Sequence, residues 1–175
     1  MTDLPPLPDF RSPAEFWARA LAIEVEATER YELLADQMAV HNNHEVAEIF
    51  AKMAIIEGKH RDEITRRAAG IDLGAEAAKF GWTGPDGPET ADFEQVHYLM
   101  NAHQALRIAR HNEDRAARWF AAVAARATDP EIVALAAEYA EEERQHVVWV
   151  DDWLKKFPPP DAGWDDDPDP PVFSD

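Results

Sequence analysis

The sequence repeats one short pattern, Glu-x-x-His, as Glu57-Gly58-Lys59-His60 and again as Glu143-Arg144-Gln145-His146. Each copy follows a glutamate that stands apart from it, Glu24 before the first and Glu113 before the second. Residues three apart lie on one face of a helix, so that each pattern sets a carboxylate beside an imidazole. One Glu from each of two helices and one Glu-x-x-His from each of two others provide six ligands, which is enough for two metal ions.

Four helical segments are expected, and caps, glycines and prolines set their ends. They run over about 13–40, 45–69, 92–127 and 130–157. The first opens with a capping box made by Ser12 and Glu15, and the second has Asn42 or Asn43 as its cap. No stretch alternates as a strand would, which predicts an all-α fold.

One long connection, residues 70–91, is rich in glycine and separates the second segment from the third. The other connections are short, which predicts two antiparallel hairpins joined by a crossover. The hairpins also match in sequence, since Ala20, Glu24, Ala27, Tyr31 and Ala35 align with Ala109, Glu113, Ala116, Phe120 and Ala124. We predict an antiparallel four-helix bundle with pseudo-twofold symmetry over 13–156, an N-terminal extension over 1–12 and an acidic, proline-rich tail over 157–175.

The candidate ligands fall on the apolar faces of their helices. At about 100° per residue, Glu24 lies among Ala20, Ile23 and Ala27, and the other five fall in equivalent stripes. An unpaired buried carboxylate costs several kcal/mol, so that four of them require compensation. Two divalent cations would supply it, and oxygen ligands with one imidazole per metal suit iron or manganese.

Charge and composition exclude several function classes. The chain has 35 acidic against 17 basic residues and a formal net charge of -18, which argues against nucleic acid as a partner. It contains no cysteine, and so no disulfide, thiolate zinc site or iron–sulfur cluster. The start has no leader pattern, and no apolar run approaches the roughly 20 residues that span a bilayer, so we expect a cytoplasmic protein without a membrane partner.

These residues resemble the rubrerythrin and bacterioferritin branch of the ferritin-like superfamily over Pro13 to Lys156. The resemblance implies a ferritin-like fold with two iron ions, or manganese in their place. It also implies that Glu57 and Glu143 bridge the metals, that Glu24 and Glu113 are terminal carboxylates, and that His60 and His146 are terminal nitrogen ligands.

Two positions depart from the family pattern. Rubrerythrins carry an extra glutamate one turn beyond the ligand of the third helix, where this chain has Ala116, and a cysteine-rich rubredoxin module that is absent here. Bacterioferritins place a haem-binding methionine directly after the first bridging glutamate, where this chain has Gly58. We therefore expect no haem.

Tyr31 lies one heptad after Glu24, where it could donate a hydrogen bond next to the ligands or act as a redox-active phenol. The alternative is a core tyrosine with its hydroxyl group satisfied, which we favour.

The function expected from these residues is that of a non-haem diiron oxidoreductase of rubrerythrin type, acting on peroxide or dioxygen and oxidising ferrous iron. Its electron donor is not encoded in the chain, and a homodimer or larger homo-oligomer is expected. Two alternatives stay open. The same centre could feed an iron store inside a protein shell, or the bundle could be an interaction module with a vestigial site.

Overall fold

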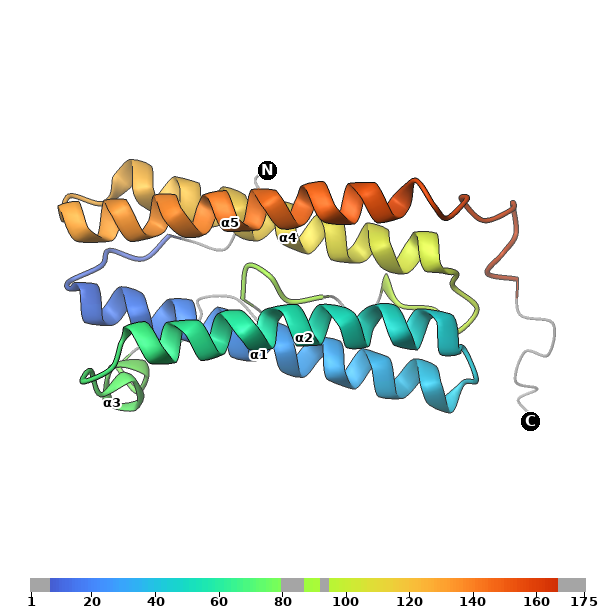
Figure 1. Cartoon of the computed structure of the whole chain (residues 1–175), viewed down its shortest axis with the longest axis horizontal. Coiled ribbons are helices and arrows are strands. Elements are labelled where there is room, and N and C mark those ends of the chain that lie inside the picture. The colour runs from blue at the N-terminus through green and yellow to red at the C-terminus, as the bar shows by residue number, and fades with distance from the viewer. Residues whose placement is uncertain (1–6, 80–86, 92–94, 167–175) are drawn as a thin grey trace, which may run out of the picture.

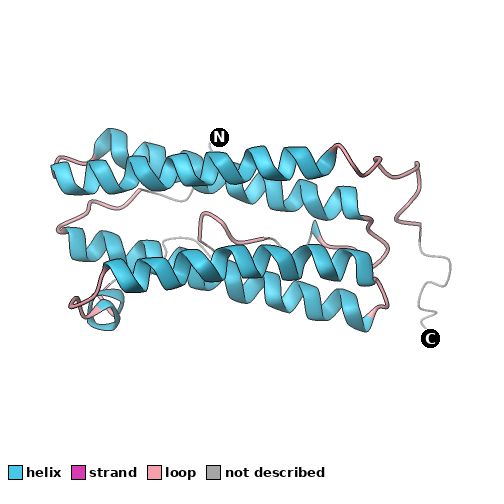
Figure 2. Ribbon diagram, in the orientation of Figure 1, coloured by secondary structure: helices cyan, strands magenta, loops and turns pink. Residues whose placement is uncertain are grey.

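The computed structural model describes residues 7–79, 87–91 and 95–166. Its helices are α1 (Pro13–Val40), α2 (His44–Arg67), α3 (Leu73–Ala77), α4 (Ala102–Arg126) and α5 (Pro130–Leu154). The described part of the chain contains no strand (Figure 2). The prediction of an all-α fold is confirmed.

Local sequence signals start the long helices. The Ser12 hydroxyl accepts the N–H of Glu15 at 3.2 Å, ahead of Pro13 in the first helical position. Asn43, rather than Asn42, caps α2, and Asp129 caps α5. Each cap satisfies an N–H group that the first turn of a helix leaves without a partner, so these boundaries are encoded locally.

The third long helix begins later than the sequence pattern suggested. Instead of starting near Asp92, α4 starts at Ala102, where Asn101 and Gln104 form a capping box. The preceding segment is held out of a helix by Asn43, whose side chain donates to the carbonyls of Tyr98 (3.2 Å) and Met100 (2.7 Å). The crossover is therefore longer than 70–91, whereas residues 92–94 lie outside the described part.

Two helical hairpins form the molecule (Figure 1). Helix α1 packs along α2, and α4 packs along α5, while α2 approaches α4 and α1 approaches α5 between the hairpins. In Figure 1 the described stretch 87–91 of the crossover, drawn in yellow-green, lies between the two pairs, whereas α3 lies beside α1. This is the ferritin-like bundle with one long crossover that the repeat predicted.

The buried core is divided into two apolar clusters. One includes Tyr31, Phe50, Leu106 and Val150, and the other includes Ile23, Ile64, Phe120 and Tyr139. Along each long helix, the candidate ligand stands between residues of the first cluster and residues of the second. The bundle therefore places the polar site at mid-height, sealed by apolar packing at both ends.

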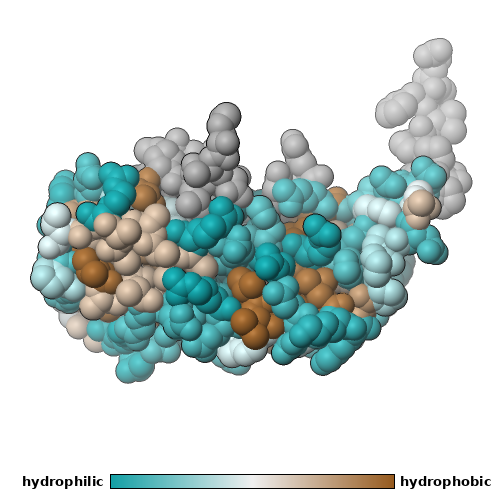
Figure 3. Space-filling model, turned by 90° about the horizontal axis from the view of Figure 1, so that it is seen from above, coloured by the Kyte–Doolittle hydropathy of each residue, from teal (hydrophilic) through white to brown (hydrophobic). Residues whose placement is uncertain are grey.

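The surface seen in Figure 3 is largely hydrophilic, with hydrophobic residues in scattered patches. Large exposed hydrophobic side chains of the described residues include Ile55 on α2 and Trp149 on α5. No described helix is both long and apolar enough to cross a membrane. Part of the acidic tail lies against the bundle, since Trp164 packs edge-on against His97 with ring centroids 5.5 Å apart.

Candidate metal centre

The bundle brings all six predicted ligands to one place. Three groups of side chains each offer ligand atoms within 4.8 Å of one another, and the groups share members. They are Glu24 with Glu57 and His60, Glu57 with Glu113 and His146, and Glu24 with Glu89 and Glu143. Each of α1, α2, α4 and α5 thus contributes to a single cluster, as the repeated pattern requires.

Most carboxylate oxygens of this cluster are buried without a hydrogen-bond donor. Glu24, Glu57, Glu113 and Glu143 each have 0 % exposure. Within the described part of the chain, both oxygens of Glu24, Glu57 and Glu143 and one oxygen of Glu113 accept no hydrogen bond. Buried polar atoms are nearly always paired, and an unpaired carboxylate is among the most costly groups to bury, so this set calls for a bound cation.

The two histidines sit differently. The Nδ1 atom of His146 lies 3.0 Å from Glu113 Oε2 and 3.2 Å from Glu143 Oε2, and its side chain is 4 % exposed. The Nδ1 atom of His60 lies 3.8 Å from Glu143 Oε1, and its side chain is 18 % exposed. The rings are 4.6 Å apart between centroids, so both can face one pair of metals.

Electrostatics follow from this burial. Desolvation, followed by the charges of neighbouring carboxylates, raises the pKa of Glu24 and of Glu57 well above the usual value. Burial also lowers the pKa of His60. For His146 burial acts in the same direction, but the adjacent Glu113 and Glu143 carboxylates outweigh it and raise the pKa. The cluster therefore holds more negative than positive charge, and only bound protons or cations can neutralise the excess.

The donor set fits a pair of metal ions. Four glutamates carry the charge that two divalent cations would neutralise, and each half of the cluster adds one imidazole. Carboxylate oxygen with imidazole nitrogen, and no sulfur, is the ligand chemistry of iron or manganese rather than of a structural zinc site. The carboxylate oxygens without hydrogen-bond partners and the types of donor atom both fit a pair of metal ions.

One acidic residue of the cluster was missed by the sequence reasoning. Glu89 belongs to the crossover and is 1 % exposed, yet a carboxylate oxygen of it lies within 4.8 Å of ligand atoms of Glu24 and Glu143. Helical periodicity could not reveal it, because its position in a turn has no repeat. The one hint in the sequence was Ala116, where a glutamate was expected from the resemblance and none is present.

Tyr31 is buried beside the cluster. Its hydroxyl accepts a hydrogen bond from Asn112 Nδ2 at 3.2 Å, and its ring stacks on Phe50 with centroids 6.1 Å apart. Burial and the nearby Glu113 carboxylate raise its pKa well above the usual value. These contacts suit a core tyrosine whose hydroxyl group is satisfied.

A model of the rubrerythrin family matches residues 15–151, which include all seven acidic and imidazole groups of the cluster. The chain belongs to the rubrerythrin family. This rubrerythrin-family protein is also similar to an uncharacterised conserved protein from Magnetospirillum magnetotacticum MS-1, known from a crystal structure. The two are 38 % identical, the match covers 86 % of this chain and 98 % of the other, and the TM-score is 0.63. No protein with curated annotation matches the chain.

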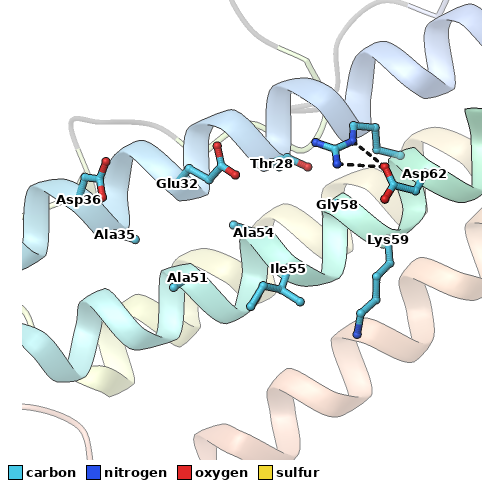
Figure 4. A pocket seen from close by; sticks show the side chains of 11 residues that line it. Thr28, Glu32, Ala35, Asp36, Ala51, Ala54, Ile55, Gly58, Lys59 and Asp62 are labelled. Atoms are coloured by element: carbon cyan, nitrogen blue, oxygen red, sulfur yellow. Dashed lines mark hydrogen bonds and ion pairs between the residues drawn. The ribbon is translucent and has the colours of Figure 1, made fainter.

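The rubrerythrin-family bundle also has a groove on its outside, between α1 and α2 (Figure 4). Its volume is about 600 Å³, and small residues such as Ala54 and Gly58 form part of its lining. Asp62 lies on its rim and pairs with Arg61 at 3.0 Å. None of the clustered ligands lines the groove, so the metal centre does not open into it.

Proposed function

We propose that this protein is a non-haem diiron oxidoreductase of rubrerythrin type, which reduces peroxide or dioxygen and oxidises ferrous iron. The observation that supports it most is a set of converging, fully buried carboxylates with orphaned oxygens, beside two imidazoles. A protein does not retain this much uncompensated charge in its core for stability. The family supplies a second, independent argument for iron.

In this proposal each helix has its own task. Glu57 and Glu143 would bridge the metals, because Glu57 belongs to two of the ligand groups and Glu143 lies near both histidines, 3.8 Å from His60 and 3.2 Å from His146. Glu24 and Glu113 are terminal carboxylates, and the two histidines supply nitrogen. When bound, two ferrous ions supply the two electrons that convert peroxide to water.

The burial of the site selects small oxidants. The helix-borne carboxylates are fully buried, and apolar clusters seal the bundle above and below them. The side chain of His60 is the most exposed part of the cluster, at 18 %. Peroxide or dioxygen can approach past this ring, whereas a larger substrate would have to part the helices.

The proposed reaction needs a supply of electrons. The chain has no cysteine and therefore no rubredoxin-like or iron–sulfur centre of its own. We propose that a separate reductase or small electron carrier reduces the centre between turnovers. Two electrons and two protons per peroxide balance the reaction.

For the test, the protein is loaded with ferrous iron in the absence of oxygen, and unbound metal is then removed. We expect two iron ions per chain, and rapid loss of one peroxide per iron pair in stopped-flow absorbance. Iron near zero would instead support the interaction module with a vestigial site. A hollow assembly of many subunits on gel filtration, taking up iron far beyond two per chain, would support iron storage.

A further inference from the structure

We propose that Glu89 is a further metal ligand, supplied by the crossover rather than by a helix. The proposal rests on the dinuclear centre described above and adds a residue to it. It also assigns a task to residues 87–91, which we call the crossover strap. The strap carries Glu89 to the centre and holds it there.

Glu89 has the environment of a ligand and not that of a surface acid. It is 1 % exposed, and neither of its oxygens accepts a hydrogen bond from the described residues. One of them lies within 4.8 Å of ligand atoms of Glu24 and Glu143. A buried, unpartnered carboxylate directed at two other carboxylates is strongly unfavourable unless a cation lies among them.

A tight turn directs Glu89 inwards. The N–H of Thr90 donates to the carbonyl of Gly87 at 3.4 Å, so Pro88 and Glu89 occupy the two central positions of a turn. Proline favours the first of these positions because its φ angle is fixed near the required value. A Cβ atom on Gly87 would lie 2.8 Å from Glu26 Oε2, so a side chain at this position would displace the carboxylate that holds the strap.

Both hairpins hold the strap. From α1, Glu26 accepts the N–H of Gly87 at 3.3 Å, and Arg30 donates to the carbonyl of Ala91 at 2.5 Å. From α4, Arg115 donates to the carbonyls of Pro88 and of Thr90, the latter at 2.6 Å.

Two of these anchors are related by the duplication. Because Glu24 aligns with Glu113, Glu26 aligns with Arg115. The repeat has therefore diverged at this position into an acid that binds the N–H of the strap and a base that binds its carbonyls. Such a divergence is expected if each copy became specialised for one side of the same segment.

A fifth carboxylate changes the charge of the centre. Four carboxylates balance two divalent ions, so the charge of Glu89 favours a metal pair with one more positive charge. Loss of Glu89 should therefore raise the reduction potential of the iron pair. A carboxylate that lies outside the centre would leave this potential unchanged.

The experiment compares Glu89→Gln with Glu15→Gln in the full chain. Glu15 is also buried, at 4 % exposure, but it is paired with Arg11 and Arg19 and belongs to no ligand group. The measurements are Mn²⁺ affinity by competition with a chelator, the change in melting temperature on adding Mn²⁺, and the potential of the iron-loaded protein.

For Glu89→Gln we expect Mn²⁺ affinity to fall at least about tenfold, the metal-dependent rise in melting temperature to shrink, and the potential to rise. The metal-free variant should melt at a higher temperature than the metal-free parent, because a buried charge is gone. Glu15→Gln should leave affinity and potential unchanged. Unchanged affinity in Glu89→Gln, with a parent protein that does bind metal, would overturn the proposal and leave the dinuclear centre intact. A parent protein that binds no metal would overturn both.

Arg115→Met tests the strap separately, because Arg115 touches the strap and offers no ligand atom. We expect a loss of Mn²⁺ affinity in the same direction as for Glu89→Gln, but smaller. If the affinity stays at the parent value, the strap does not hold Glu89 in place, and that part of the proposal is wrong.

Discussion

The two helical hairpins carry the same ligands but hold them differently. In α4 and α5, His146 lies within 3.2 Å of two carboxylates and is almost fully buried. In α1 and α2, His60 has its nearest carboxylate oxygen at 3.8 Å and is partly exposed. The duplication therefore supplies a symmetric set of donors, while packing makes the two halves unequal. One half holds its histidine between two carboxylates, and the other leaves its histidine partly exposed.

This inequality extends to the neighbours of the histidines. Trp149 follows His146 by one turn of α5 and lies over its ring, with the two ring centroids 5.0 Å apart. The matching position of α2, three residues after His60, holds Glu63, which has no ring. A ring held between a tryptophan and two carboxylates has little freedom left, so that little entropy is lost when it binds metal.

The largest expected effect comes from removing a ligand that both hairpins supply. Replacing Glu57 and Glu143 together by alanine takes away the proposed bridge from each half, so metal content should fall from two ions per chain to near zero. Metal analysis of the purified, iron-loaded variant measures this. Far-ultraviolet circular dichroism is the control for folding. Retention of full metal content would contradict the assignment of both halves.

Single histidine replacements should sharpen the contrast between the hairpins. His146→Ala removes a preorganised ligand and should weaken Mn²⁺ binding about tenfold more than His60→Ala, a difference of about 1.4 kcal/mol. Isothermal titration calorimetry gives both values. His111→Ala, on α4 but outside the ligand groups, is the matched control and should bind as the parent does. Equal losses for His60 and His146 would show that the halves are equivalent.

The metal-free protein should lose stability as pH rises, whereas the carboxylates of most proteins lower stability as pH falls. The pKa values of Glu24, Glu57 and Glu89 are raised in the folded protein above the ordinary 4.5, because burial penalises the charged form. Their contribution to stability is fully present below pH 4.5 and is lost as pH rises through the folded-state pKa values.

Thermal melts in chelator should therefore show a melting temperature that falls as pH rises above about 4.5. With Mn²⁺ the gain from metal should grow over the same range, since metal replaces protons. The variant without Glu57 and Glu143 should have a shallower slope in chelator. A slope as steep as that of the parent would place the titrating groups elsewhere.

The smallest expected effect comes from comparing two buried tyrosines, one in each apolar cluster. Tyr31→Phe leaves the buried side chain of Asn112 without its partner, which should cost about 1 kcal/mol and lower the melting temperature by about 2–4 °C. Tyr139 is equally buried, but its hydroxyl has no partner among the described residues, so Tyr139→Phe should be neutral or stabilising. Differential scanning calorimetry of both metal-free variants decides between these outcomes.

Local signals account for much of what could be predicted. The capping residues Ser12, Asn43 and Asp129 satisfy the first N–H groups of their helices, which depends only on residues nearby in sequence. The late start of α4 is also encoded locally, in the capping box of Asn101 and Gln104, although the helical pattern extends further back in the sequence. The six helix-borne ligands could be found because a helix repeats its face every three to four residues.

Glu89 could not be found in this way. Its place in the cluster depends on a turn at Gly87, on Arg115 from α4 and on Glu26 from α1, which are far apart in the chain. The unequal exposure of His60 and His146 likewise has no counterpart in the repeated pattern.

The sequence by itself determined the bundle, its duplication and a symmetric set of donors, because helical periodicity and caps act over a few residues. Only the tertiary structure decided how far each histidine is exposed, which of them is fixed, and that a crossover carboxylate joins the donors. These properties depend on long-range packing, in which each position is set by several segments at once.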